Sequence, residues 1–284
     1  MCVRRLCLIL WVVAACGPRD VPASHGRASG VATDSTAAIA MSGDWPSELG
    51  TSLVIPADTE STAVLLYPAS ISVVADPSAQ FTLLAPDGDP VRVRVGVTAS
   101  DSAHCGDAAI LHLVRATPLL WSVGLAGTTA RPLWSDSLDA FAAADSALYS
   151  VEAPRLASIV SARLSTRLSG LPFALSGVRR IQFGDTTIIA AQLTRRVNQE
   201  ANPVEERTFV VAERAGSAPF TTVHSNRSEG SEDTAAHFDL LGAFRTTSAL
   251  YLIVTTDTPS GSTIEILERS AGNWRVRWTR TISC

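Results

Sequence analysis

The 284-residue chain contains no lysine, because all 23 of its basic residues are arginine. A P-loop, a pyridoxal Schiff base and a Ser-x-x-Lys nucleophile each require a lysine amine, so the sequence excludes these three chemistries. Only 18% of the residues are charged and 46% are hydrophobic, which excludes disorder throughout and suffices for one large or two ordinary domains. The formal net charge of −4 argues against a nucleic-acid partner, which needs a basic face.

The chain also lacks the usual signatures of a catalytic or metal site. None of its five histidines has metal-ligand spacing relative to another histidine or a cysteine. His237 and Asp239 could orient a serine nucleophile, but no Gly-x-Ser-x-Gly motif supplies one. We therefore predict no metal ion, no cofactor and no catalytic residue.

Acidic residues crowd one stretch that contains Asp185, Glu200, Glu205, Glu206 and Glu213. A glycosidase-like carboxylate pair is one interpretation of this stretch. The favoured interpretation places Glu200, Glu205 and Glu206 around a long polar hairpin loop. We expect solvated charges there, pairing loosely with nearby arginines for under about 1 kcal/mol each.

The first 16 residues have the organisation of a secretory signal. Arg4 and Arg5 precede a short apolar run over residues 6–15. This run is about half of the roughly 20 apolar residues that a transmembrane helix needs, and no other stretch is long enough to span a membrane.

The residues Val13-Ala14-Ala15-Cys16 resemble the lipobox of bacterial lipoproteins, in which the cysteine thiol receives a diacylglycerol. The resemblance implies a mature chain that begins at Cys16 and is held in a membrane by acyl chains, each buried methylene contributing about 0.8 kcal/mol. Lipoproteins retained at the inner membrane often carry aspartate after the cysteine, whereas Gly17 stands here. The resemblance therefore implies a cell-envelope protein at the outer membrane rather than the inner one. An ordinary cleaved signal with a chance cysteine is the alternative.

Two thiols remain in the folded part if this processing applies. Cys2 and Cys7 would leave with the signal and Cys16 would carry lipid, which leaves Cys105 and Cys284. An exported chain enters an oxidising compartment, so we expect these two cysteines to form one disulfide. Two free thiols, or a catalytic thiol at Cys105, are the alternatives.

Composition and hydrophobic periodicity divide the chain into five segments: a signal (1–15), a flexible tether (16–50), an N-terminal antiparallel β unit (51–130), a helical connector (131–170) and a C-terminal β-meander domain (171–284). In the connector, Asp136 can cap a first helix and Pro154 suits the first turn of a second. We expect a mainly β fold with a short two-helix segment.

The C-terminal domain contains two similar groups of four expected strands, within residues 178–224 and 238–279. Their third strands end alike, Val211-Ala212-Glu213-Arg214 and Ile266-Leu267-Glu268-Arg269, at an offset of 55 residues. Such a repeated four-stranded meander resembles two blades of a β-propeller. Because two blades cannot close a ring, we expect a shared sheet, a sandwich or a partly open barrel.

The repeat places Glu213 and Glu268 equivalently, each at the end of an otherwise apolar strand. We expect each carboxylate to accept hydrogen bonds from loop amides or to pair with an arginine. A ligand site between the two meanders is the alternative.

The last hairpin of the chain has a definite expected register. Trp274, Val276 and Trp278 alternate with arginines and are expected to share the buried face. This arrangement predicts the three-residue loop Ser270-Ala271-Gly272 and a positive φ at Gly272.

The sequence favours a lipid-anchored envelope protein with a non-catalytic role in binding or assembly. The membrane is its first partner, through lipid on Cys16, and an envelope protein or a glycan is a possible second one. The alternative is an exported hydrolase that uses acidic residues.

Overall fold

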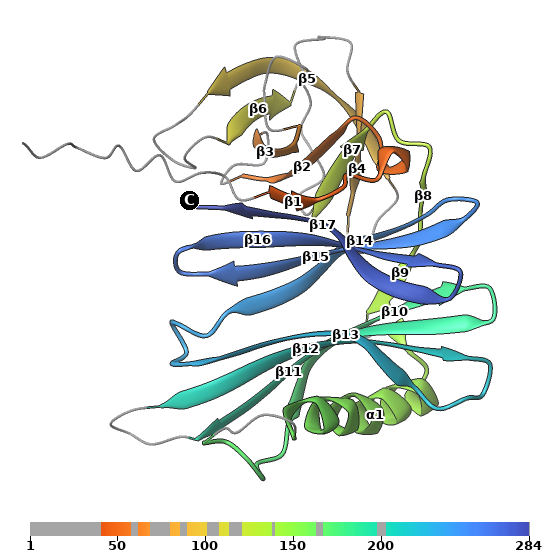
Figure 1. Ribbon diagram of the computed structural model, residues 1–284, viewed down its shortest axis with the longest axis vertical. Helices are drawn as coiled ribbons and strands as arrows, with labels where there is room; N and C mark the ends of the chain where they lie inside the picture. Colours follow the sequence, from red (N-terminus) through yellow and green to blue (C-terminus); the bar gives the residue numbers. More distant parts are fainter. Residues whose placement is uncertain are drawn as a thin grey trace, which may run out of the picture. The chain divides into compact units, whose positions relative to one another are not determined.

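The structure, a computed structural model, describes residues 41–57, 62–68, 80–85, 90–100, 108–113, 121–137, 140–162, 167–197 and 203–283. These residues belong to one unit of the chain and form a barrel, two antiparallel sheets and one α-helix (Figure 1). The predicted fold class is confirmed, because the chain is mainly β and an antiparallel unit precedes two four-stranded meanders. No described helix is long and apolar enough to cross a membrane.

A closed barrel with the strand order β2-β3-β6-β5-β4-β7 forms within residues 51–130. Its strands are β2 (Ser52–Pro56), β3 (Thr62–Tyr67), β4 (Gln80–Leu84), β5 (Val91–Ser100), β6 (Ala109–Leu113) and β7 (Val123–Ala126). Alternate apolar residues such as Val54, Phe81 and Leu111 fill one buried cluster of the barrel. A Cβ at Gly124 would lie only 2.7 Å from Val54 Cγ2, so a glycine lets β7 approach this core closely.

The two meanders form two separate sheets instead of one shared sheet. The first sheet contains β10 (Ala174–Phe183), β11 (Thr186–Val197), β12 (Val204–Ala215) and β13 (Thr221–Gly230), and the second contains β14 (His237–Arg245), β15 (Ala249–Thr258), β16 (Gly261–Ser270) and β17 (Asn273–Ile282). Short strands extend their edges: β9 (Ser135–Ser137) on β10, β8 (Arg131–Pro132) on β14 and β1 (Met41–Gly43) on β17.

The second sheet is the middle layer of the folded unit. On β15, Tyr251 and Ile253 pack in a cluster shared with the barrel, whereas Leu250 and Leu252 pack in a cluster shared with the first sheet. Both faces of β15 are therefore buried, which explains its continuous apolar run.

The two sheets stack head to tail, which here means that the front face of one packs on the back face of the other. Val211 of β12 packs toward the second sheet, whereas Ile266, its equivalent on β16, packs toward the barrel. Each sheet thus presents the same face in the same direction. This arrangement leaves the outer face of the first sheet to be covered by another element, and α1 (Ala143–Ser161) covers it.

The helical connector differs from its prediction, because one helix replaces two. Helix α1 continues through Pro154, where a helix boundary was expected. Tyr149 and Leu156, on either side of the proline, are both buried against the first sheet, and this packing compensates for the hydrogen bond that proline removes. The predicted cap at Asp136 is also wrong: Asp136 lies on β9, where its carboxylate accepts a 2.6 Å hydrogen bond from Arg180.

The end of the predicted tether is ordered. Residues 41–50 contain β1 and the short 3₁₀ helix η1 (Ser47–Leu49), and β1 pairs with β17. Trp45 stacks on Tyr67 with ring centroids 4.1 Å apart, and Leu49 is fully buried. These two apolar side chains in a polar stretch hold the segment against the folded unit. Residues 16–40 lie outside the described part of the chain.

The register expected for the last hairpin is wrong. Ser270 pairs with Asn273, so the loop is the two-residue turn Ala271-Gly272, with φ values of 49° and 80°. A bulge at Arg277 then brings Trp278 opposite Ile266. The side chains expected to share a buried face therefore separate: Trp278 is 1% exposed in the cluster with the barrel, Trp274 packs toward the first sheet and Val276 is 47% exposed.

Candidate binding cleft

A cleft of about 400 Å³ lies between the two sheets, beside β10 and β14, the first strands of the two meanders. Gln192 and Arg179 line it from the first sheet, and His237 and Asp239 line it from the second. A smaller hollow of about 220 Å³ adjoins the cleft and shares Gln192 and His237 with it. The described residues thus bring hydrogen-bonding groups from both meanders into one concavity.

The edges of β10 and β14 explain the position of the cleft. Among the described residues, β9 pairs with only residues 179–181 of β10, and β8 with only residues 244–245 of β14. Bulges between Leu175 and Gly177, and between Leu240 and Gly242, interrupt the regular pairing of both strands nearby. Bulges bend the strands that carry them, so the sheets separate here while their apolar centre stays closed.

Asp239 and Gln192 join the two sheets at the cleft. Gln192 Nε2 donates a 3.1 Å hydrogen bond to Asp239 Oδ1, which also accepts a 2.8 Å bond from the backbone N–H of Leu240. Burial raises the pKa of Asp239 above its usual value, although the Leu240 bond and the charges of Arg179 and His237 oppose the rise. The contact fixes one carboxylate oxygen and one amide N–H.

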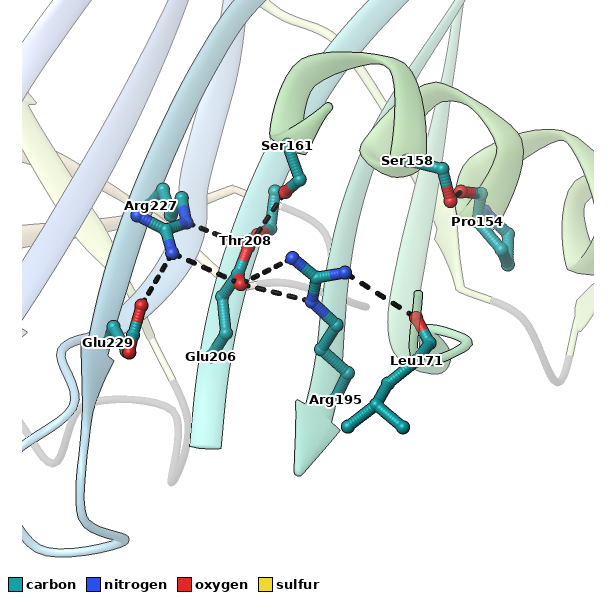
Figure 2. A network of polar contacts seen from close by, with 9 residues as sticks. All are labelled: Pro154, Ser158, Ser161, Leu171, Arg195, Glu206, Thr208, Arg227 and Glu229. Atoms are coloured by element: carbon teal, nitrogen blue, oxygen red, sulfur yellow. Dashed lines mark hydrogen bonds and ion pairs between the residues drawn. The ribbon is translucent and has the colours of Figure 1, made fainter. Parts of the chain in front are cut away.

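A second polar cluster lies on the other face of the first sheet, at the C-terminal end of α1 (Figure 2). Its centre is the fully buried carboxylate of Glu206 on β12. Arg195 of β11 donates hydrogen bonds of 3.0 and 2.7 Å to Glu206 Oε2. Ser161, the last residue of α1, donates a 2.7 Å bond to Oε1, and Arg227 Nε of β13 lies 2.8 Å from the same oxygen.

The electrostatics of this cluster favour the ionised carboxylate. Burial alone would raise the pKa of Glu206, but hydrogen bonds from Arg227, Ser161 and Arg195 outweigh it and lower the pKa to about 2. The Arg195 guanidinium also lies 4.5 Å from the ring centroid of Phe173. The cluster ties α1 to three strands of the first sheet, which indicates a structural role.

The expectation that Glu205 and Glu206 lie in a solvated hairpin loop is wrong. Strand β12 begins at Val204, so Glu205 and Glu206 lie in the strand and are 7% and 0% exposed. Glu205 Oε1 is 2.5 Å from Arg207, in a pair whose side chains are 10% and 24% exposed. Glu200 lies outside the described residues.

Glu213 and Glu268 each pair with arginine, as expected, but the structure does not bring them to one site. Glu213 Oε2 accepts hydrogen bonds from Arg269 Nε at 2.7 Å and Trp274 Nε1 at 2.9 Å, across the two sheets. Glu268 lies on the barrel side of the second sheet and accepts a 2.6 Å bond from Arg275. Neither glutamate lines the cleft, so a ligand site built on these two residues is not supported.

A further cross-sheet contact joins β13 to β16. Asn226 Nδ2 donates a 2.9 Å hydrogen bond to Glu265 Oε2, and His224 Nε2 lies 3.6 Å from the same oxygen. Burial lowers the pKa of His224, and the charge of Glu265 opposes this effect. Side chains of the two sheets therefore fill this site.

The other predicted site residues remain untested by the structure. Cys16, Cys105 and Cys284 lie outside the described residues, and so do the lipid attachment and the disulfide expected of them. Within the described ranges, no group of three or more histidine, cysteine, aspartate or glutamate side chains is arranged to hold a metal ion.

Sequence reasoning did not identify the cleft, although two of its residues carried a signal. His237 and Asp239 are close on one expected strand, but Gln192, the partner of Asp239, lies 47 residues away in the sequence. No protein-family model matches the chain, and no curated protein or solved structure matches it significantly.

Proposed function

We propose that the chain is a lipid-anchored cell-envelope protein whose β domain is a non-catalytic binding module, with the cleft between the two sheets as its binding site. The cleft itself carries this proposal. A volume of about 400 Å³ lies within the range of ligand pockets, and the lining combines a few placed polar groups with the apolar side chains of Ala190, Phe209 and Leu240.

The anchor rests on the resemblance of Val13-Ala14-Ala15-Cys16 to a lipobox. Metabolic labelling of the full chain with a fatty acid tests it: the wild type should be labelled and Cys16→Ser should not. Equal labelling of both chains would exclude lipid at Cys16. Fractionation of the labelled cells then tests the outer-membrane assignment.

The disulfide between Cys105 and Cys284 belongs to the same proposal. Thiol titration of the unfolded, unreduced full chain tests it, with Cys105→Ser as the comparison. If the bridge exists, this variant gains one titratable thiol from the released Cys284. A free-thiol count that falls by one instead would exclude the bridge.

The binding role is tested by blocking the cleft. Ser176 is exposed on β10 and lines both hollows, so Ser176→Trp fills the opening without disturbing a buried side chain. Gln182→Trp is the matched control, because Gln182 is exposed on the same strand and does not line the cleft. The full chain in detergent is used to capture partners from envelope extracts. A partner held by the wild type and Gln182→Trp but lost with Ser176→Trp supports the proposal, and equal capture by all three opposes it.

An exported hydrolase that uses acidic residues is the second candidate, and the raised pKa of Asp239 favours it. A general acid needs such a shift, and the negative charge of Asp257 on the adjacent strand contributes to it. Incubation with a panel of glycans and esters tests this function. Turnover that disappears in Asp239→Asn would replace the non-catalytic proposal.

A further inference from the structure

The geometry points to a neutral saccharide as the ligand of the cleft, held through the Asp239–Gln192 pair; this inference rests on the proposed binding function. Saccharide hydroxyl groups each donate and accept a hydrogen bond, and their rings present apolar C–H faces. A complementary site therefore needs interspersed donors and acceptors above an apolar surface.

The apolar requirement is met by Ala190, Phe209 and Leu240 in the lining, and the polar groups of the cleft meet the other. The contact between Gln192 and Asp239 uses one amide N–H and Asp239 Oδ1. Within the described part of the chain, Gln192 thus keeps a second N–H and its carbonyl oxygen for a ligand, and Asp239 keeps Oδ2 as an acceptor. Ser137 and Ser176 add hydroxyl groups that both donate and accept. The fixed pair is preorganised, so less side-chain entropy is lost when a ligand binds.

The charges of the lining favour a neutral ligand. Arg179 and Asp239 contribute opposite charges to the cleft. In the adjoining hollow, Arg207 is engaged by Glu205 at 2.5 Å and by the carbonyl oxygen of Ala235 at 2.9 Å. Arg179 and Asp239 balance each other and Glu205 balances Arg207, so an anionic ligand would find no net positive charge in the cleft.

The strand edges argue against an extended peptide as the occupant. Peptides that add to a sheet edge need a row of unbonded backbone groups. On β14, the carbonyl oxygen of Leu241 already accepts a 2.5 Å bond from Ser122, and that of Ala243 accepts a 2.8 Å bond from Leu133. The edge that remains at the cleft is short, so side-chain recognition dominates.

Calorimetric titration of the full chain in detergent tests the inference. The probes are neutral trisaccharides of glucose and of N-acetylglucosamine, with a trisaccharide of glucuronic acid as the charged counterpart. We expect a neutral probe to bind, and the charged probe to bind at least tenfold more weakly. Gln192→Leu should weaken binding of the neutral probe at least tenfold, because it removes the amide NH2 group, the amide carbonyl oxygen and the contact with Asp239.

The matched control is Gln182→Leu, the same substitution at an exposed position of β10 outside the cleft, which should change the affinity by less than twofold. Thermal melting confirms that each variant is folded. A folded wild type that binds no neutral probe overturns the saccharide assignment, and so does a Gln192→Leu variant that binds as the wild type does. If capture of another partner still depends on Ser176, the binding cleft survives and only the saccharide assignment fails.

Discussion

Arg269 donates a 2.7 Å hydrogen bond from Nε to Glu213 Oε2 and so joins the third strands of the two meanders. The same Glu-Arg dipeptide ends both strands, but its residues face different layers. Glu213 points from the first sheet toward the second, and Arg269 points back. The head-to-tail stacking creates this contact, because equivalent residues of the two sheets face the same direction.

The Glu213–Arg269 pair should contribute measurably to the packing of the two sheets. Its side chains are only 18% and 20% exposed, so we expect a double-mutant cycle with Glu213→Gln and Arg269→Gln to give a coupling energy of about 1 kcal/mol. Urea denaturation of the four proteins measures it. The control cycle is Glu152–Arg155 on α1, an equally short but more exposed pair expected to couple by under about 0.5 kcal/mol. Equal coupling in both cycles would contradict this prediction.

Neutralising Glu206 should destabilise the fold more than neutralising an exposed carboxylate does. Glu206→Gln leaves Arg195 and Arg227 facing a neutral amide in a buried site, so we expect the free energy of unfolding to fall by about 3 to 5 kcal/mol. Glu229→Gln removes the more exposed partner of Arg227 and should cost under about 1 kcal/mol. Urea denaturation at neutral pH compares the two variants. Similar losses would show that Glu206 does not organise the cluster.

The same carboxylate should make the stability depend on pH in the acid range. Its pKa is lowered from 4.5 to about 2 in the folded state, so its contribution is complete above pH 4.5 and is lost as the pH falls toward 2. A shift of this size corresponds to a stabilisation on the order of 3 kcal/mol. Urea midpoints measured from pH 6 to pH 2 should fall more steeply for the wild type than for Glu206→Gln. Parallel curves would refute the assignment.

Two buried arginines should respond oppositely to replacement by methionine. Arg280 is fully buried, and among the described residues only the carbonyl oxygen of Leu66 accepts a hydrogen bond from it. Burial lowers its pKa, so Arg280→Met should leave the stability unchanged or raise it by about 1 to 4 kcal/mol. Arg195→Met removes a partner of buried Glu206 and should lower the stability by about 3 kcal/mol or more. Thermal and urea unfolding measure both changes, and a large loss in Arg280→Met would reveal an anionic partner for its guanidinium.

The sequence predicted well where a feature depends on neighbouring residues. The antiparallel unit and the repeated meanders follow from apolar runs and turn residues, which act locally. Predictions failed where a local sequence signal, such as a proline or a turn glycine, was outweighed by the packing of distant residues. Pro154 normally begins a helix, yet the buried stripe on both sides of it makes α1 continuous. Gly272 has the expected positive φ, but the two-residue turn and the bulge at Arg277 set another register.

By itself, the sequence determined most of the strands, the mainly β class and the absence of lysine-dependent chemistry. The tertiary structure decided which layer each strand face meets, and therefore which polar residues are buried. Glu206 resembles a loop residue in the sequence, because its local neighbours are polar and its partners Ser161 and Arg227 are 45 and 21 residues away. The local sequence therefore does not show that its carboxylate is buried and paired. Likewise, only the packing of two sheets brings Gln192 to Asp239 and opens the cleft. Alternation along a strand is encoded locally, whereas the partner of each face depends on contacts between distant segments.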